Sequence, residues 1–262
     1  MIFLQLHESE SSTYTYLLGD PDSGLAILVD PVLETVDRDL QAVHALGLKL
    51  AWSLDTHIHA DHLTGARKLR SLVGSKIAVP AMDRLACADL GVEEGRPLIM
   101  GSLALHPMHT PGHTDTHHAY RLAHAGIERV FTGDALLIDG CGRTDFQGGS
   151  AAALYASVRE KLFTLPPDTL VYPAHDYQGR RVSTIAQERT RNPRLKDGIG
   201  LAEFEAIMHG LNLPYPKKMD LAVPGNRECG KCPDSVVESM HALCGKSVQG
   251  VPSAGQNEET NR

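Results

Sequence analysis

Alternating polar and apolar residues near the start of the chain predict a β-hairpin. Residues 13–18 alternate in this way, a turn sequence rich in Asp, Pro and Gly follows at residues 20–24, and residues 25–29 are apolar again. Successive side chains of a strand point to opposite faces, and turn residues between two such runs indicate antiparallel pairing. The chain should therefore open with two paired strands.

The apolar spacing then changes to that of a helix. From residue 36 to residue 46 apolar side chains lie three or four positions apart, and Gly47 follows them. This spacing predicts a helix, and the glycine its end. Residues 48–54 read as a buried strand, residues 63–73 as a helix and residues 76–79 as a further strand.

The second half repeats this alternation, and helical propensity falls after residue 213. Strands are predicted at residues 98–100, 103–108, 118–122, 129–131 and 169–172, and helices at 150–165, 183–191 and 201–211. Strands in two groups, each with its own helices, favour an α/β fold with four αββα layers. We place one domain at residues 1–246 and expect the polar tail at 247–262, which lacks aromatic residues, to be disordered.

Composition excludes several classes of protein. The chain has 262 residues, 42% of them hydrophobic, and a formal net charge of -7. A surface of this sign repels nucleic acid. No apolar run approaches the roughly 18 residues that a membrane span needs, and the first ten residues do not resemble a signal or transit peptide.

The cysteines suggest a reducing compartment. Five cysteines at uneven spacing do not form a disulfide framework, so we expect a cytoplasmic protein. Cys229 and Cys232 have the spacing of half a zinc or redox site. No second pair of this kind completes it, and we expect these two cysteines to be unpaired.

Metal-binding chemistry is concentrated in one short segment. His57, His59, Asp61 and His62 lie within six positions, directly after the strand predicted at residues 48–54. His57 and His59 should alternate on the strand end and point the same way, and Asp61 and His62 should begin the next helix. So many ligand-type side chains in one place indicate a bound cation.

Three further ligand candidates also follow predicted strands. These are His113, Asp134 and His175. Gly133, directly before the aspartate, permits a close approach of the backbone. Each residue alone is a weak indication of a ligand, but the ordered series is specific.

The complete series resembles the metal signature of the metallo-β-lactamase superfamily. The resemblance implies ligands on loops at one edge of an αββα sandwich. It also implies two metal positions: His57, His59 and His113 with Asp134 for one, and Asp61, His62 and His175 with bridging Asp134 for the other. Many members are dinuclear zinc hydrolases, so this pattern leaves the reaction open.

Longer motifs resemble the persulfide dioxygenase branch of that superfamily. The matching segments are residues 30–35, 132–147, 172–177, 192–195 and 211–218, within a resemblance that covers residues 13–232. The branch implies one Fe(II) per chain, held by His57, His113 and Asp134, that oxidises glutathione persulfide with O₂. His59, Asp61, His62 and His175 would then orient the ligands and tune the iron. Zinc has no redox chemistry and could not activate O₂.

Substrate contacts are harder to assign from the sequence. Glutathione carries carboxylates, so Arg143 is the candidate cation for them, and Tyr177 is a candidate hydrogen-bond donor. The alternative for Arg143 is a pair with Asp145 that braces the loop, and for Tyr177 simple packing. His117 and His118, where relatives have small residues, should begin a strand with one ring inwards and one outwards.

A thiolester hydrolase resembling glyoxalase II, with two zinc ions, is the second hypothesis. It shares the fold, the ligand series and glutathione as carrier, but it needs a hydroxide bridging two metals. A non-catalytic sensor would need an exposed partner surface, which no sequence feature indicates. The oligomeric state, including a homodimer, stays open at this level.

Overall fold

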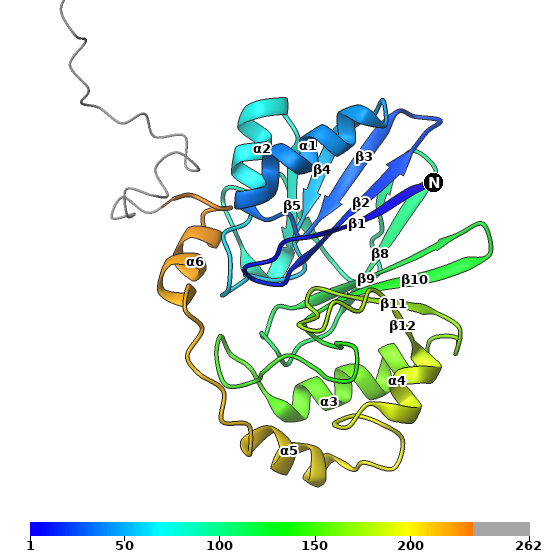
Figure 1. Ribbon diagram of the computed structural model, residues 1–262, viewed down its shortest axis with the longest axis vertical. Coiled ribbons are helices and arrows are strands. Elements are labelled where there is room, and N and C mark those ends of the chain that lie inside the picture. Colours follow the sequence, from blue (N-terminus) through cyan, green and yellow to red (C-terminus); the bar gives the residue numbers. More distant parts are fainter. Residues whose placement is uncertain (233–262) are drawn as a thin grey trace, which may run out of the picture.

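Two six-stranded sheets dominate the computed structural model, which describes residues 1–232 (Figure 1). The first sheet runs in the order β1 (Ile2–His7), β2 (Tyr14–Asp20), β3 (Leu25–Val29), β4 (Lys49–Leu54), β5 (Lys76–Pro80) and β6 (Leu90–Val92). The second runs in the order β12 (Ser183–Thr184), β11 (Leu170–Pro173), β10 (Ile127–Gly133), β9 (His118–His124), β8 (Leu103–His109) and β7 (Leu98–Met100). Strand neighbours are thus mostly sequence neighbours, as expected for short connections.

The pairing directions decide where the loops gather. β2 and β3 form the expected antiparallel hairpin, with Tyr16 opposite Val29. β3, β4, β5 and β6 are parallel, and so are β10 and β11. The carboxyl ends of parallel strands lie at one edge of a sheet, so the loops after β4, β10 and β11 can meet there.

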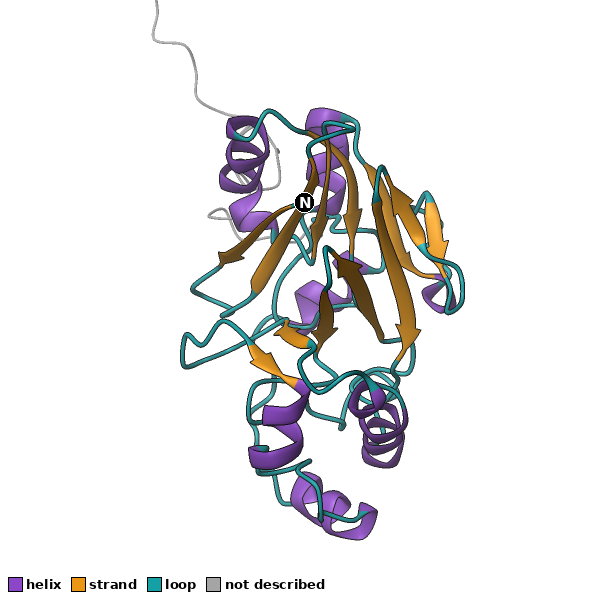
Figure 2. Ribbon diagram, turned by 90° about the vertical axis from the view of Figure 1, so that its right-hand side faces the viewer, coloured by secondary structure: helices purple, strands orange, loops and turns teal. Residues whose placement is uncertain are grey.

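Helices cover the outer face of each sheet and give the four αββα layers (Figures 1 and 2). An apolar cluster with Val36, Val43 and Leu69 joins α1 (Val36–Ala45) and α2 (Ala66–Val73) to the first sheet. A second cluster joins the other sheet to α3 (Ala151–Glu160), α4 (Ile185–Arg191) and α5 (Leu201–His209). A third cluster, rich in aromatic rings, fills the space between the sheets. The four-layer αββα sandwich expected from the sequence is confirmed.

Several elements differ from the expectation. β1 and β6 are short edge strands whose sequences gave no distinct alternation, and α6 (Met219–Asn226) forms although Pro224 lies inside it. The helix expected at residues 150–165 ends as α3 at Glu160, with a 3-10 turn at Leu162–Thr164. Tertiary pairing and packing outweigh local propensity at each of these places.

The expectation that Cys229 and Cys232 are unpaired is wrong, because both are disulfide-bonded. Cys229 forms a disulfide with Cys87, 142 positions earlier in the chain. Local spacing cannot reveal such a pair, because the two residues meet only in the folded chain. The tail at 247–262 and the domain boundary at residue 246 lie outside the described residues. Within residues 1–232, every helix is too short or too polar to cross a membrane.

Candidate metal centre

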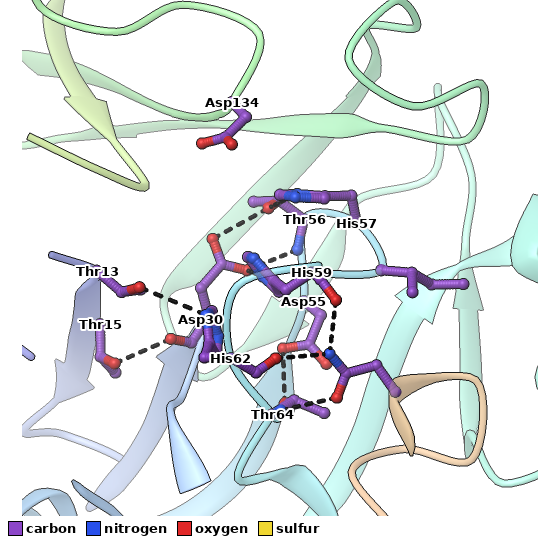
Figure 3. A network of polar contacts seen from close by, with 12 residues as sticks. Thr13, Thr15, Asp30, Asp55, Thr56, His57, His59, His62, Thr64 and Asp134 are labelled. Carbon is purple, nitrogen blue, oxygen red and sulfur yellow. Dashed lines mark hydrogen bonds and ion pairs between the residues drawn. The ribbon is translucent and has the colours of Figure 1, made fainter. Parts of the chain in front are cut away.

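Loops from both sheets bring the seven ligand candidates to one edge of the sandwich. The loop between β4 and α2, residues 55–65, carries His57, His59, Asp61 and His62, and we call it the metal loop. His113 follows β8, Asp134 follows β10 and His175 follows β11. Figure 3 shows Asp134 on its own strand end, across from the histidines of the metal loop. Asp61 and His62 lie within this loop and not in α2, which begins only at Ala66, so that part of the expectation is wrong.

The first cluster contains His57, His113 and Asp134, whose ligand atoms all lie within 4.8 Å of one another. His113 Nε2 is 3.4 Å from Asp134 Oδ2, and its Nδ1 is 2.8 Å from the carbonyl oxygen of Arg143. A carbonyl can only accept, so Nδ1 carries the proton and Nε2 is left with its lone pair toward the cluster.

His57 is oriented in the same way by a relay of two residues. The Thr56 hydroxyl donates to Asp30 Oδ2 at 3.0 Å and lies 2.9 Å from His57 Nδ1. Because the hydroxyl proton is used on Asp30, the oxygen accepts from Nδ1–H. The Nε2 lone pair of His57 is therefore also free for a cation. Figure 3 shows this chain of contacts.

The second cluster contains His59, Asp61 and His175, again with ligand atoms within 4.8 Å of one another. His62 lies beside it, with Nδ1 3.0 Å from Asp61 Oδ2. His175 Nε2 is 3.6 Å from both Asp61 and Asp134, so Asp134 lies between the clusters. His57 and His59 thus belong to different clusters and do not act as one pair.

Burial and neighbouring charges shift the pKa values of His57 and His59 in opposite directions. Burial, with the neighbouring histidines, holds the pKa of His57 well below its usual range. Burial also lowers the pKa of His59, but Asp30, 3.1 Å from its Nε2, outweighs this and raises the pKa to about 9. Without a cation, His57 is neutral and able to bind a metal, whereas His59 keeps a proton.

The donor set fits a metal ion. His59 Nδ1, His62 Nε2 and Asp134 Oδ1 are buried and have no hydrogen-bond partner among residues 1–232. Buried polar atoms without partners are costly, and imidazole nitrogens with a carboxylate are ligands that first-row transition metals accept. A cation at the first cluster would satisfy Asp134 Oδ1, whereas His59 Nδ1 and His62 Nε2 lie at and beside the second cluster.

His117, which sequence reasoning missed, fixes the position of Asp134. Its Nε2 accepts a hydrogen bond from the backbone N–H of Asp134 at 3.1 Å, and its Nδ1 lies 2.9 Å from Thr110 Oγ1. Burial keeps the pKa of His117 well below its usual range, so the ring is neutral and can accept. His117 and His118 are both buried, and β9 begins at His118 as expected.

Of the two substrate candidates, Arg143 is engaged in hydrogen bonds and Tyr177 is largely exposed. The Arg143 guanidinium makes a two-pronged pair with Asp145, at 2.6 and 2.7 Å, and donates to the carbonyl oxygen of Pro214 at 2.7 Å. This is the bracing arrangement considered above. Tyr177 is 76% exposed, and its ring is stacked on His175 at an angle of 6°.

Comparisons with known proteins agree with this geometry. Residues 9–175 match the family model of the metallo-beta-lactamase superfamily. The mitochondrial persulfide dioxygenase ETHE1 of Mus musculus is 50% identical over 230 residues, which is 88% of this chain and 89% of that relative. The crystal structure of ETHE1 from Myxococcus xanthus is 52% identical, with a TM-score of 0.84, over 88% of this chain and all of that one. A hydroxyacylglutathione hydrolase of a Polaromonas species is 36% identical over 179 residues, 67% of this chain and 66% of that relative.

Proposed function

This chain belongs to the metallo-beta-lactamase superfamily and, within it, to the persulfide dioxygenases, and we propose that it oxidises glutathione persulfide to sulfite and glutathione at one Fe(II). It is an oxidoreductase that acts on a persulfide and O₂. The outer sulfur gains two oxygen atoms from O₂ and one from water, and the thiol is released. The glyoxalase II hypothesis is the weaker one, because its relative shares less identity over a shorter part of the chain.

The observation that carries the iron assignment is the cluster of His57, His113 and Asp134. Two imidazole nitrogens and one carboxylate within 4.8 Å of one another form the donor set of a 2-His-1-carboxylate centre. Fe(II) bound there would supply open positions and redox chemistry for persulfide and O₂. Hydrogen bonds to neighbouring residues hold each donor in place. The Arg143 carbonyl accepts from His113, the Thr56 hydroxyl accepts from His57, and the His117 ring accepts from the backbone N–H of Asp134.

The residues of the second cluster would support the iron centre without binding the iron. His59, Asp61, His62 and His175 border Asp134 and link it to Thr13 and Asp30 by polar contacts. His59 Nε2 lies 3.1 Å from Asp30 Oδ1, so a proton can be held between them and can move to the carboxylate. We propose that these four residues orient the ligands and handle protons, and that they hold no second metal.

Arg143 and Tyr177 remain our candidates for substrate contact. Arg143 spends three of its five N–H groups on Asp145 and Pro214 and retains two without a hydrogen bond to the described residues. Those two can reach a carboxylate of glutathione. The exposed Tyr177 hydroxyl, on the ring that covers His175, can donate to the same substrate.

Metal analysis with O₂ uptake tests the proposed function directly. Protein purified without air should contain close to one iron per chain and little zinc, and it should consume O₂ and form sulfite when given glutathione persulfide. The control is a glutathione thiolester, which it should not hydrolyse at a comparable rate. Two zinc ions per chain in an active preparation would overturn the proposal.

Arg143→Lys tests the substrate contact. Lysine cannot reproduce a two-pronged contact, so KM for glutathione persulfide should rise roughly ten- to a hundredfold, which corresponds to about 1.4 kcal/mol per factor of ten. Iron content should stay normal, and a small persulfide without carboxylates should be much less affected. Asp145→Asn is the matched control, because it breaks the brace and keeps the guanidinium. If Asp145→Asn reproduces the effect for both substrates, Arg143 braces the loop and does not bind substrate.

Location and assembly are further parts of the proposal. The cysteine count favours a cytoplasmic location, but the Cys87–Cys229 disulfide weakens that argument. The mammalian relative is mitochondrial by name.

We propose glutathione as the persulfide carrier because the chain shares its family with proteins of glutathione chemistry. We propose a homodimer as the assembly, and sedimentation would test it.

A further inference from the structure

Asn226, the last residue of α6, is buried against the metal loop from a distant part of the chain. Its Oδ1 accepts a hydrogen bond from the backbone N–H of Thr64 at 2.9 Å, and its Nδ2 donates to the carbonyl oxygens of His59 at 2.9 Å and His62 at 2.8 Å. These partners fix which amide atom is oxygen, because an N–H needs an acceptor and carbonyls need donors. The three contacts span 162 to 167 positions of sequence.

The metal loop depends on such outside contacts for its shape. It contains no helix or strand between β4 and Ala66, so its backbone groups need partners from other segments. Asn226 supplies three at once, and it is only 4% exposed. The carbonyls of His59 and His62 frame Asp61, so holding them fixes the direction of the side chains that border Asp134. Asn226 touches the backbone of the loop and none of the proposed ligand atoms.

A covalent link holds Asn226 in this place. Cys229, three residues further on, forms the disulfide with the half-buried Cys87. The Cys229 carbonyl also accepts a hydrogen bond from the backbone N–H of Arg67 at 3.0 Å, at the start of α2. The space there is closed, since a Cβ on Gly230 would lie 2.1 Å from the Thr64 carbonyl oxygen. The segment after α6 is thus bonded to Cys87 and Arg67 and packed against Thr64.

We propose that Asn226 positions the metal loop and that the Cys87–Cys229 disulfide keeps Asn226 against it, so that metal binding responds to the redox state of this cysteine pair. A dithiol reductant would transfer two electrons and two protons to the two sulfurs, break the S–S bond and leave as a cyclic disulfide. The identity of the metal rests on the proposed function, but the positioning role does not.

Binding of Fe(II), and of Co(II) as a spectroscopic probe, tests the role of Asn226. Asn226→Ala should weaken binding of either ion about 10-fold, the lower end of the range for residues that support ligands, because it acts through the backbone of the loop that carries His57. It should also shift the visible absorption of bound Co(II). Asn226→Asp keeps an acceptor for Thr64 but loses both donors, so it should behave like Asn226→Ala. An Asn226→Asp protein with wild-type affinity and spectrum would overturn the role of the two donors.

Asn192→Ala is the matched control. Asn192 is equally buried, but its amide donates to Gly140 and Glu188 and not to the metal loop. Both alanine variants should lower the melting temperature, whereas the shift in the Co(II) spectrum should be specific to Asn226→Ala. Equal shifts in both proteins would mean general loosening and overturn the proposal. The number of ions bound by the unchanged protein tests the proposed function separately.

Cys87→Ser tests the disulfide and remains available should Asn226→Ala fail to fold. It should weaken metal binding in the same direction, and dithiol treatment followed by desalting should do the same to the unchanged protein but nothing further to Cys87→Ser. In Cys87→Ser/Asn226→Ala the losses should be less than additive, because both act through one contact. Unchanged affinity after reduction and in Cys87→Ser would overturn the redox part of the proposal.

Discussion

Replacing His57, His113 or Asp134 by alanine is expected to abolish iron binding and, with it, O₂ uptake. Each substitution removes one of the only three protein bonds that the proposed centre offers, and the remaining pair is too few to hold Fe(II) against water. Iron per chain, measured after anaerobic loading and desalting, should fall close to zero in all three variants.

His59→Ala and His62→Ala are the controls for that experiment. Both residues lie on the metal loop, as His57 does, but neither belongs to the first cluster. They should retain appreciable iron and lose rate, about 10- to 100-fold, as for residues that support ligands. If they remove the metal as completely as His57→Ala, both clusters bind ions and a dinuclear centre is the better description.

Gly133→Ala should damage both the fold and the metal site, although Gly133 is not a ligand. Gly133 has φ of +51°, and a Cβ there would lie 2.3 Å from His117 Nε2 and 2.9 Å from Thr56 Oγ1. The left-handed backbone costs a residue with a side chain about 1–2 kcal/mol, and the overlap typically adds about 1–3 kcal/mol. The overlap also displaces the nitrogen that accepts the Asp134 N–H, so metal content should fall together with the free energy of unfolding.

Gly24→Ala separates backbone strain from overlap. Gly24 has φ of +68°, but nothing lies within 4 Å of an added Cβ. Its variant should lose only the contribution of the backbone and keep its full metal content. Denaturant titration gives the free energies of unfolding, and metal analysis of the same samples gives the occupancy. Equal losses in the two variants would show that contact with His117 is unimportant.

Much of the site was accessible to sequence reasoning, because it depends on side-chain type and local spacing. The hairpin at β2–β3, the helix α1 and most strands follow from apolar periodicity, which can be read from short runs of neighbouring residues. The ligand candidates follow from their chemistry and from their positions directly after predicted strands. The resemblance of the longer motifs to persulfide dioxygenases agrees with the relatives found.

Only the tertiary structure decided which of these residues meet. His57 and His59, two positions apart, belong to different clusters, whereas His57, His113 and Asp134 come together from three loops of two sheets. The residues that hold them follow the same rule: His117 binds the Asp134 backbone across 17 positions, Asn226 binds the metal loop across more than 160, and Cys87 meets Cys229 across 142. Strand order and sheet packing set such distances. A sequence pattern carries the chemistry of each residue but not the long-range geometry that brings it to its partner.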